Sequence, residues 1–553
     1  MRDLISTAQS FSAPFLRVGA LSFLILQVLV GFVSAAEIQV SPDLSGAGTA
    51  LAKAISAAAA GDTLLLQPGV YRERVKITKL LTLRGLPGAV MDGATPFTAT
   101  WSADGEAKTF VVPVKARPYG LLTRGRFIAE LRFERAQEKG DWHWRTLIEK
   151  GPPLSGFDQI KALWVYDPKE KKMHARFENG VAPDGLALTL ITAKEPLIQI
   201  SKVQGVKIEG LEFRSATVAV SLEEGAVSCT VSRCRISSYE KSGIVITGGA
   251  SHCVIEDCDI TRGALEDWSP NREQGRVNYE IWRIHKDVGH YDRVGIVLAG
   301  AGAGNRILRN HLHRTFDGIT LGDSNSESLD IPLADPDHGR DTEIAENLIE
   351  DTRDSAIELG VGCINVNVHH NTLRHTHGGL RFKLPRIGPV FIHHNRLING
   401  APFNIWFSMD SSTAEGYVYH NTFVGGDPAL MQLSFNGKKR DFTAPKWHFV
   451  NNLVLGKDGF FEQGRNTPPP DFTTANNVCV HDNRPWPNDP AKDKCSLYNV
   501  SIQHDETGKP AAGSAAVDTG LDLSTYWNGN PLPGCAPGYF KGKAPDAGAD
   551  EVD

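Results

Sequence analysis

The sequence lacks the features that mark several classes of protein. It has no excess of basic residues, because 58 Lys and Arg against 64 Asp and Glu give a formal net charge of −6. A basic nucleic-acid-binding face is therefore not expected. Hydrophobic residues make up 41% and charged residues 22% of the chain, which excludes the composition of a disordered protein. No stretch after residue 36 is apolar for long enough to span a bilayer.

One apolar run lies close to the N-terminus. Residues 19–33 are apolar, Arg2 and Arg17 precede them, and the small residues 34–36 follow. A run of fifteen residues is short for a membrane span but typical of a signal peptide. We expect a signal peptide over residues 1–36 and a secreted or periplasmic mature chain without a membrane span. An uncleaved anchor is the alternative.

A repeat of about 24 residues dominates the rest of the chain. Each unit contains an apolar residue, a spacer, Asn or Cys, another spacer and a second apolar residue. The units lie at residues 229–236, 253–260, 305–312, 342–349, 366–373, 390–397 and 447–454. The shared asparagines are Asn310, Asn347, Asn371, Asn395, Asn421 and Asn452.

Two repeat architectures have this period. A leucine-rich repeat would require leucine to dominate and the rest of each unit to be helical or compact. Here each unit carries a second short alternating segment, often led by glycine, which is typical of a strand after a turn. The segments are residues 243–246, 295–298, 318–321, 356–359, 379–382 and 404–407. We therefore predict an all-β protein, a right-handed parallel β-helix solenoid.

The Asn and Cys positions fit stacked coils. An Asn side chain at a bend can hydrogen-bond the backbone, and identical side chains stack from coil to coil. Cys229 and Cys253 are 24 residues apart, as are Cys234 and Cys258. Coils about 4.8 Å apart would bring each pair within disulfide range. Disulfides and stacked thiols are both open.

The N-terminal part resembles a known family. Residues 49–60 predict an amphipathic helix, with Leu51, Ile55 and Ala58 on one side, that caps the solenoid. Residues 61–77 and 81–93 closely resemble the first coils of pectin-lyase-like proteins, and the resemblance continues over about 200–460. We expect a signal peptide (1–36), a cap with the first coils (37–94), an inserted β-rich subdomain (95–200), the β-helix core (201–460) and a C-terminal cap and tail (461–553).

Side-chain alternation predicts one outward column of functional side chains. The third residues of four strand segments should point outward: Thr320, Glu358, Arg381 and Trp406, with Gln432 next. Asp317, Asp354 and His377 come just before these strands, and Lys383 follows Arg381 on the same face. Insertions at 263–292 and 323–341, the second of which contains Asp323, should flank this face. Long loops on a regular scaffold are usually functional.

This face predicts action on a polysaccharide, which we expect to be acidic. The resemblance to alginate and pectate lyases implies Lys or Arg beside acidic Ca²⁺ ligands. We therefore expect a polysaccharide lyase or epimerase. Arg381 and Lys383 are the first catalytic candidates, Asp317, Asp354 and His377 are the next, and Glu358 is expected to be a Ca²⁺ ligand. Trp406, Glu358 and Asp323 would bind the substrate. We expect a monomer.

Other interpretations remain open. The resemblance to polygalacturonases rests on Asp317-Gly, Asp354-Ser, His377-Gly and Arg381-Phe-Lys383, and implies an inverting glycoside hydrolase. A binding or surface-structural β-helix is the third class. Glu358 and Arg381 could form a surface ion pair without catalysis. Asp317 and Asp354 could cap turns without a catalytic role. Trp406 could simply pack on its strand.

Overall fold

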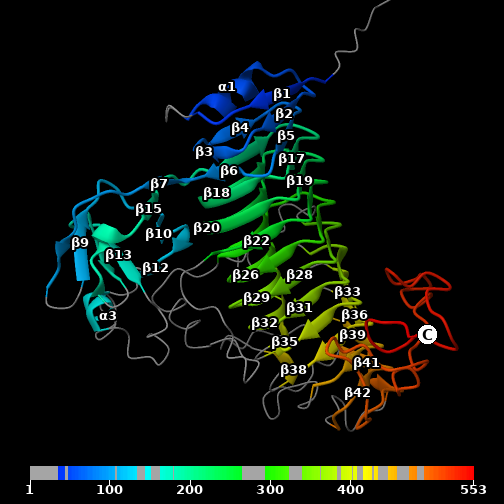
Figure 1. Ribbon diagram of the computed structural model, residues 1–553. Coiled ribbons are helices and arrows are strands. Elements are labelled where there is room, and N and C mark those ends of the chain that lie inside the picture. Colours follow the sequence, from blue (N-terminus) through cyan, green and yellow to red (C-terminus); the bar gives the residue numbers. More distant parts are fainter. Residues whose placement is uncertain are drawn as a thin grey trace, which may run out of the picture. The chain divides into compact units, whose positions relative to one another are not determined.

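The computed structural model forms one compact unit over residues 36–553 (Figure 1). It describes residues 35–43, 48–105, 109–131, 133, 144–150, 162–177, 180–263, 293–322, 339–360, 363–382, 388–400, 403–407, 415–425, 429–433, 446–456, 472–482 and 491–552. The expected signal peptide, apart from its last two residues, lies outside these ranges. Among the described residues, no helix is long and apolar enough to cross a membrane.

Two parallel ladders of short strands define the solenoid. The first is a fourteen-stranded sheet: β1 (Glu37–Val40), β2 (Thr63–Leu66), β5 (Thr82–Gly85), β17 (Lys207–Glu209), β19 (Thr230–Ser232), β21 (Val254–Glu256), β24 (Arg306–Leu308), β27 (Glu343–Ala345), β30 (Val366–His369), β33 (Val390–His393), β36 (Gly416–Tyr419), β39 (Trp447–Val450), β41 (Phe472–Ala475) and β43 (Asp493–Lys494).

The second sheet has twenty strands and covers two faces of the coils, because the long strands β18 (Glu212–Glu223) and β20 (Arg235–Thr247) belong to both. One face holds β3 (Gly69–Tyr71), β6 (Ala89–Asp92), β22 (Asp259–Thr261), β25 (His311–His313), β28 (Leu348–Glu350), β31 (Thr372–Arg374), β34 (Arg396–Ile398), β37 (Thr422–Val424), β40 (Leu453–Val454) and β42 (Val478–Cys479). The other holds β4 (Val75–Ile77), β16 (Ile198–Ser201), β23 (Val294–Ala299), β26 (Asp317–Leu321), β29 (Ser355–Leu359), β32 (Gly378–Phe382), β35 (Phe403–Phe407) and β38 (Ala429–Leu433).

The interior is packed with the inward residues of these strands. The predicted inward residues are buried with no more than 5% exposure: Ile319, Leu321, Ile357, Leu359, Leu380, Phe382, Ile405 and Phe407. Burying such aliphatic and aromatic side chains contributes about 1.5–3 kcal/mol each. The prediction of a parallel β-helix is confirmed.

Helix α1 (Ala50–Ala57) covers the first coil, as predicted for the capping helix. Its buried side, Leu51 and Ile55, packs on the core. Thr49 makes no side-chain cap. Instead, the Glu73 carboxylate accepts hydrogen bonds of 2.9 Å from the backbone N–H groups of Leu51 and Ala52. Glu73 thereby supplies the acceptors and the negative charge that a helix N-terminus favours.

The predicted inserted subdomain contains two small sheets. One consists of β7 (Ala94–Pro96), β10 (Gly120–Thr123), β11 (Arg126–Phe127) and β15 (Leu188–Ile191); the other of β8 (Ser102–Ala103), β9 (Thr109–Pro113), β12 (Ala129–Leu131), β13 (Leu163–Asp167) and β14 (Lys172–Arg176). The pairings are antiparallel except between β12 and β13. The alternation of Trp142, His143 and Trp144 in the sequence predicts a strand, but Trp144 begins helix α3 (Trp144–Lys150). Its ring is buried beside Phe133, which holds the helix to the subdomain.

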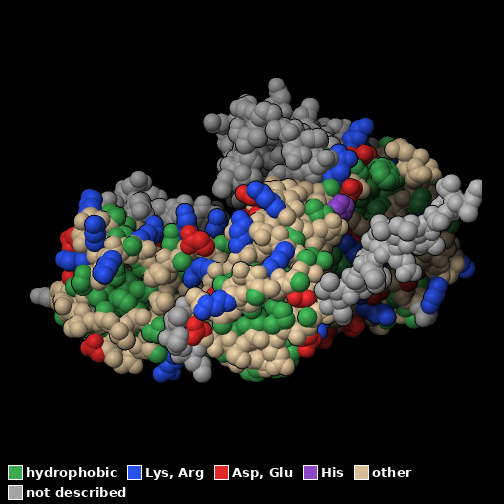
Figure 2. Space-filling view, turned by 90° about the horizontal axis from the view of Figure 1, so that it is seen from above, with side chains coloured by type: hydrophobic (Ala, Val, Ile, Leu, Met, Phe, Trp, Pro, Cys, Tyr) green, Lys and Arg blue, Asp and Glu red, His purple; other side chains and the backbone are tan. Residues whose placement is uncertain are grey.

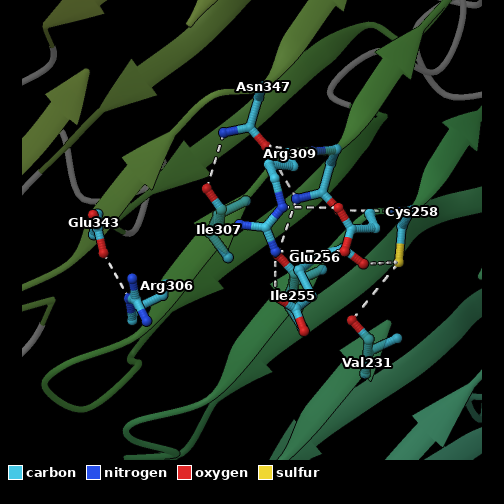
Figure 3. Close-up of polar contacts among 11 residues, drawn as sticks. Val231, Ile255, Glu256, Cys258, Arg306, Ile307, Arg309, Glu343 and Asn347 are labelled. Carbon is cyan, nitrogen blue, oxygen red and sulfur yellow. Dashed lines mark hydrogen bonds and ion pairs between the residues drawn. The ribbon is translucent and has the colours of Figure 1, made fainter. Parts of the chain in front are cut away.

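A ladder of buried asparagines runs through the corners of the coils. Asn347 Nδ2 donates to Ile307 O at 2.9 Å (Figure 3). It also donates to Asn371 Oδ1 at 2.9 Å. The same pattern links Asn310, Asn347, Asn371, Asn395, Asn421, Asn452 and Asn477. The residue before each of these corners has a positive φ, such as 58° at Glu346. The ladder satisfies backbone carbonyls that the bends leave without a strand partner.

The cysteines continue this ladder as thiols. The backbone N–H of Cys258 donates to Asn310 Oδ1 at 3.0 Å, so Cys258 takes the place of the next asparagine. Its Sγ donates to Val231 O (Figure 3). Cys229, Cys234, Cys253 and Cys258 are free and buried. Of the two open alternatives, the structure has stacked thiols.

Candidate functional site

The predicted outward column exists with the predicted register. Thr320 on β26 pairs with Glu358 on β29, Glu358 with Arg381 on β32, and Arg381 with Trp406 on β35. The register continues to Gln432 on β38. The four side chains therefore follow one another on consecutive coils of one parallel ladder, about 4.8 Å apart.

Burial of this column differs from the expectation of an exposed strand surface. Thr320 is only 5% exposed, Glu358 3% and Asp354 5%. The Arg381 side chain is 14% exposed. The prediction of a surface ion pair is therefore wrong about its environment, because Glu358 and Arg381 meet in a largely desolvated place. Charges there interact more strongly than on the open surface.

Arg381 is the centre of the site. Its Nη1 donates a hydrogen bond to Glu358 Oε2 at 3.3 Å and lies 3.7 Å from Asp354 Oδ1. Its Cζ lies 4.0 Å from the centroid of the Trp406 ring, a cation–π contact. Gly378 has no side chain below this ring: a Cβ there would be 3.9 Å from Trp406 Cε3. The Arg381 guanidinium thus contacts two carboxylates from the coil before it and an indole ring from the coil after it.

The two carboxylates converge. Both oxygens contact the same nitrogen, so Asp354 Oδ1 and Glu358 Oε2 can be at most 7.0 Å apart, the sum of 3.7 and 3.3 Å. Asp354 Oδ1 is buried and accepts no hydrogen bond from any residue in the described ranges. The hydroxyl of Thr320 is likewise buried without such a bond within the described part of the chain. Buried polar groups of this kind are rare and often belong to functional sites.

The acidic residues before the strands do not form one column. Asp354 and His377 each stand one residue before the paired positions Ser355 and Gly378. Asp317 is itself the first residue of β26, at the level of Ser355, and its Oδ1 accepts a 3.0 Å hydrogen bond from the Ser355 backbone N–H. Asp317 and His377 are 4% and 5% exposed. Asp317 thus caps the turn of the next coil, as expected if this aspartate has a structural role.

Several predicted residues lie outside the described ranges. These are Lys383, Asp323 and nearly all of the insertions 263–292 and 323–341. For Gln432 the structure gives the backbone register alone. Their roles stay predictions.

Sequence reasoning missed a polar cluster next to this face. Arg293 Nη2 lies 2.6 Å from Glu240 Oε1, with side chains 8% and 12% exposed. Arg262 lies over the Phe127 ring of the inserted subdomain, 4.9 Å from its centroid. These residues line a small pocket between the subdomain and β20. Arg262 and Arg293 stand next to strand ends, and Glu240 lies inside β20. All three are outside the repeated segments, so the repeat does not predict them.

The match to a family model agrees with the fold. Residues 196–423 match the family described as right-handed beta helix region. No curated protein matches the sequence. Among solved structures, the chain is similar to XylC in complex with xylose (15% identity, 84% of this chain and 86% of that one, TM-score 0.48). It is also similar to pectate lyase Pel9A (13% identity, 95% of this chain and 98% of that one, TM-score 0.41). A third similar structure is the polygalacturonase from Erwinia carotovora ssp. carotovora (10% identity, 80% of this chain and 96% of that one, TM-score 0.41).

The class of the molecule follows from the family match and the ladders together. It is a right-handed parallel β-helix that carries a buried carboxylate–arginine–indole cluster on one face.

Proposed function

We propose that the protein cleaves a polysaccharide and that the cluster around Arg381 is its active site. The observation that carries the proposal is the convergence of Asp354 and Glu358, both buried, on one guanidinium. Glycoside hydrolysis needs an acid and a base or nucleophile, and two carboxyl groups supply both. Their oxygens are at most 7.0 Å apart, the sum of 3.7 and 3.3 Å. This limit leaves open the spacing of about 5–5.5 Å that retaining enzymes use and excludes most of the wider range of inverting enzymes.

The other members of the cluster suit substrate binding. Trp406 is half-buried, and an indole ring can stack on the apolar face of a sugar. Asp354 Oδ1 and the Thr320 hydroxyl, buried and without hydrogen bonds to described residues, can take up the hydroxyl groups of a sugar. Arg381 orients both carboxylates before the substrate arrives, which avoids reorganisation during the reaction.

Elimination on a uronate is the second candidate. A lyase must neutralise the substrate carboxylate and remove the C5 proton. Arg381 could do the first and Lys383, two residues later in the sequence, the second. Arg381 is already paired with two carboxylates, so an acidic sugar would have to displace one of them. For this reason hydrolysis is the first candidate.

Calcium binding at Glu358 stays a prediction that the geometry disfavours. Carboxylate oxygens are ligands that Ca²⁺ prefers, but Glu358 and Asp354 already share the Arg381 guanidinium, whose positive charge opposes a second cation beside it. We expect neither the rate nor the melting temperature to change after dialysis against a calcium chelator. A loss of activity that added Ca²⁺ restores would support the calcium site instead.

A glycan screen of the mature chain tests the proposed function. Neutral, uronate-containing and sulfated polysaccharides are incubated with the protein, and both reducing ends and the absorbance of unsaturated uronates are recorded. New reducing ends without that absorbance indicate hydrolysis, and both signals together indicate a lyase. Binding without either signal would contradict the proposal and leave a binding protein.

A further inference from the structure

Four metal-ligand side chains gather on a different face of the coils. Asp259 on β22 pairs with His311 on β25, and His313 stands two residues further along β25. Glu350 on β28 pairs with His313 from the next coil. Because side chains alternate along a strand, all four point outward, whereas the intervening Ile260, Leu312 and Ile349 are fully buried.

The four side chains contact one another diagonally across three coils. His313 Nε2 lies 2.9 Å from Asp259 Oδ1, and His311 Nε2 lies 2.8 Å from Glu350 Oε1. The two imidazole rings are stacked, 4.5 Å between centroids and 24° between planes. One ligand atom each from Asp259, His311 and His313 lies within 4.8 Å of the others. A small rotation of these half-exposed side chains would bring the three atoms onto one ion.

The carboxylates of this cluster are held in place from outside. Asp259 contacts His313 through Oδ1, while its other oxygen, Oδ2, lies 3.8 Å from Arg235 Nε. Glu350 is held by Arg374 on the next coil, so its carboxylate is fixed while it contacts His311. A carboxylate that holds the second nitrogen of a ligand histidine is the usual support of a metal site.

We propose that Asp259, His311 and His313 bind a divalent transition-metal ion, with Zn²⁺ as the best match. His311 would bind through the ring nitrogen that Glu350 does not hold. Two imidazoles and one carboxylate are a ligand set that Zn²⁺ uses, with the fourth position open to water. Such an ion would tie β22 to β25. The site is separate from the cluster around Arg381, and its existence does not depend on the proposed function.

Zn²⁺ titration of the full mature chain tests this site. After removal of metals with a chelator, calorimetry should show one strong Zn²⁺ site, and Co²⁺ should give the intense visible absorption of a four-coordinate ion. His313→Ala and Asp259→Asn should each weaken Zn²⁺ binding about 10–100-fold. The control is His375→Gln, because His375 contacts a single carboxylate, Asp351, at 3.7 Å. It should bind as the unaltered chain does.

Two results would overturn the proposal. One is a mature chain that gives neither Zn²⁺ heat nor the Co²⁺ absorption. The other is equal affinity in Asp259→Asn and in His375→Gln. Asp259→Asn keeps the size of the side chain, so it gives the answer even if His313→Ala does not fold.

Discussion

Arg381 and Glu358 face each other across two consecutive coils, with 3.3 Å between Nη1 and Oε2 and side chains only 14% and 4% exposed. The pair is enclosed, as is the pair of Arg293 and Glu240, whereas several other ion pairs are more open. Basic and acidic side chains are interspersed over the face seen in Figure 2. Arg306 and Glu343 form such an open pair at 2.6 Å, with side chains 51% and 28% exposed (Figure 3).

We predict that Arg381→Ala destabilises the protein strongly, although substitutions at exposed strand positions usually change stability little. The change leaves Glu358 and Asp354 buried without their cation, which costs about 3–5 kcal/mol in the free energy of unfolding. The matched control is Arg306→Ala, which should cost about 0–1 kcal/mol. Urea unfolding of both variants measures the difference. Equal losses would mean that the Arg381 cluster is solvated.

We predict that the asparagine ladder is a main source of coil stability. Asn371→Ala removes the side chain that donates to Ile344 O and accepts from the backbone of Asn347. Each buried group left without a partner costs about 1–3 kcal/mol. Asn367→Ala, on the outer side of β30, should cost less, because Asn367 Oδ1 makes no hydrogen bond to a described residue. A similar midpoint of urea unfolding for both variants would contradict this role of the ladder.

We predict that acid destabilises the C-terminal part. Burial lowers the pKa of His420 to about 4 from the ordinary 6.5, and lowers those of His393 and His394 as well. The Asn451 amide and the Tyr539 hydroxyl face His420 Nε2 at 3.1 and 3.4 Å. Because the folded pKa is depressed, the contribution to stability is complete above about pH 6.5 and is lost as the pH falls toward 4.

The melting temperature measured between pH 8 and pH 4 checks this prediction. His420→Gln keeps an acceptor for Asn451 but cannot be protonated, so its melting temperature should depend less on pH in the acidic range. His504→Gln, at an exposed position, should keep the full dependence. A pH dependence that is the same in all three proteins would show that His420 does not carry it.

The repeat made the fold predictable from the sequence, because the same local pattern recurs in each coil. The asparagine spacing and the four outward residues Thr320, Glu358, Arg381 and Trp406 follow directly from the alternation of a strand. One register detail was not predictable. Asp317 is the first residue of β26, whereas Asp354 precedes the first residue of β29. The repeat pattern does not predict where a strand begins to within one residue.

Burial of the site could not be predicted either. Side-chain alternation says that Glu358 and Asp354 point out of the coil, but not that they are 3% and 5% exposed. Exposure depends on segments far away in the sequence, such as the inserted subdomain, whose Phe127 ring contacts Arg262 next to β22. The same limit applies to Glu240 and Arg293, whose contact joins residues 53 positions apart.

The activity of Glu358→Gln and Asp354→Asn tests the central claim most directly. Both changes keep the size of the side chain and remove its charge, and Glu343→Gln on the opposite sheet is the control. On a polysaccharide that the unaltered chain cleaves, we expect each site variant to lose at least a hundredfold in kcat with the fold intact by circular dichroism. The control should keep its rate. Full cleavage by both site variants would place the chemistry elsewhere and contradict the account.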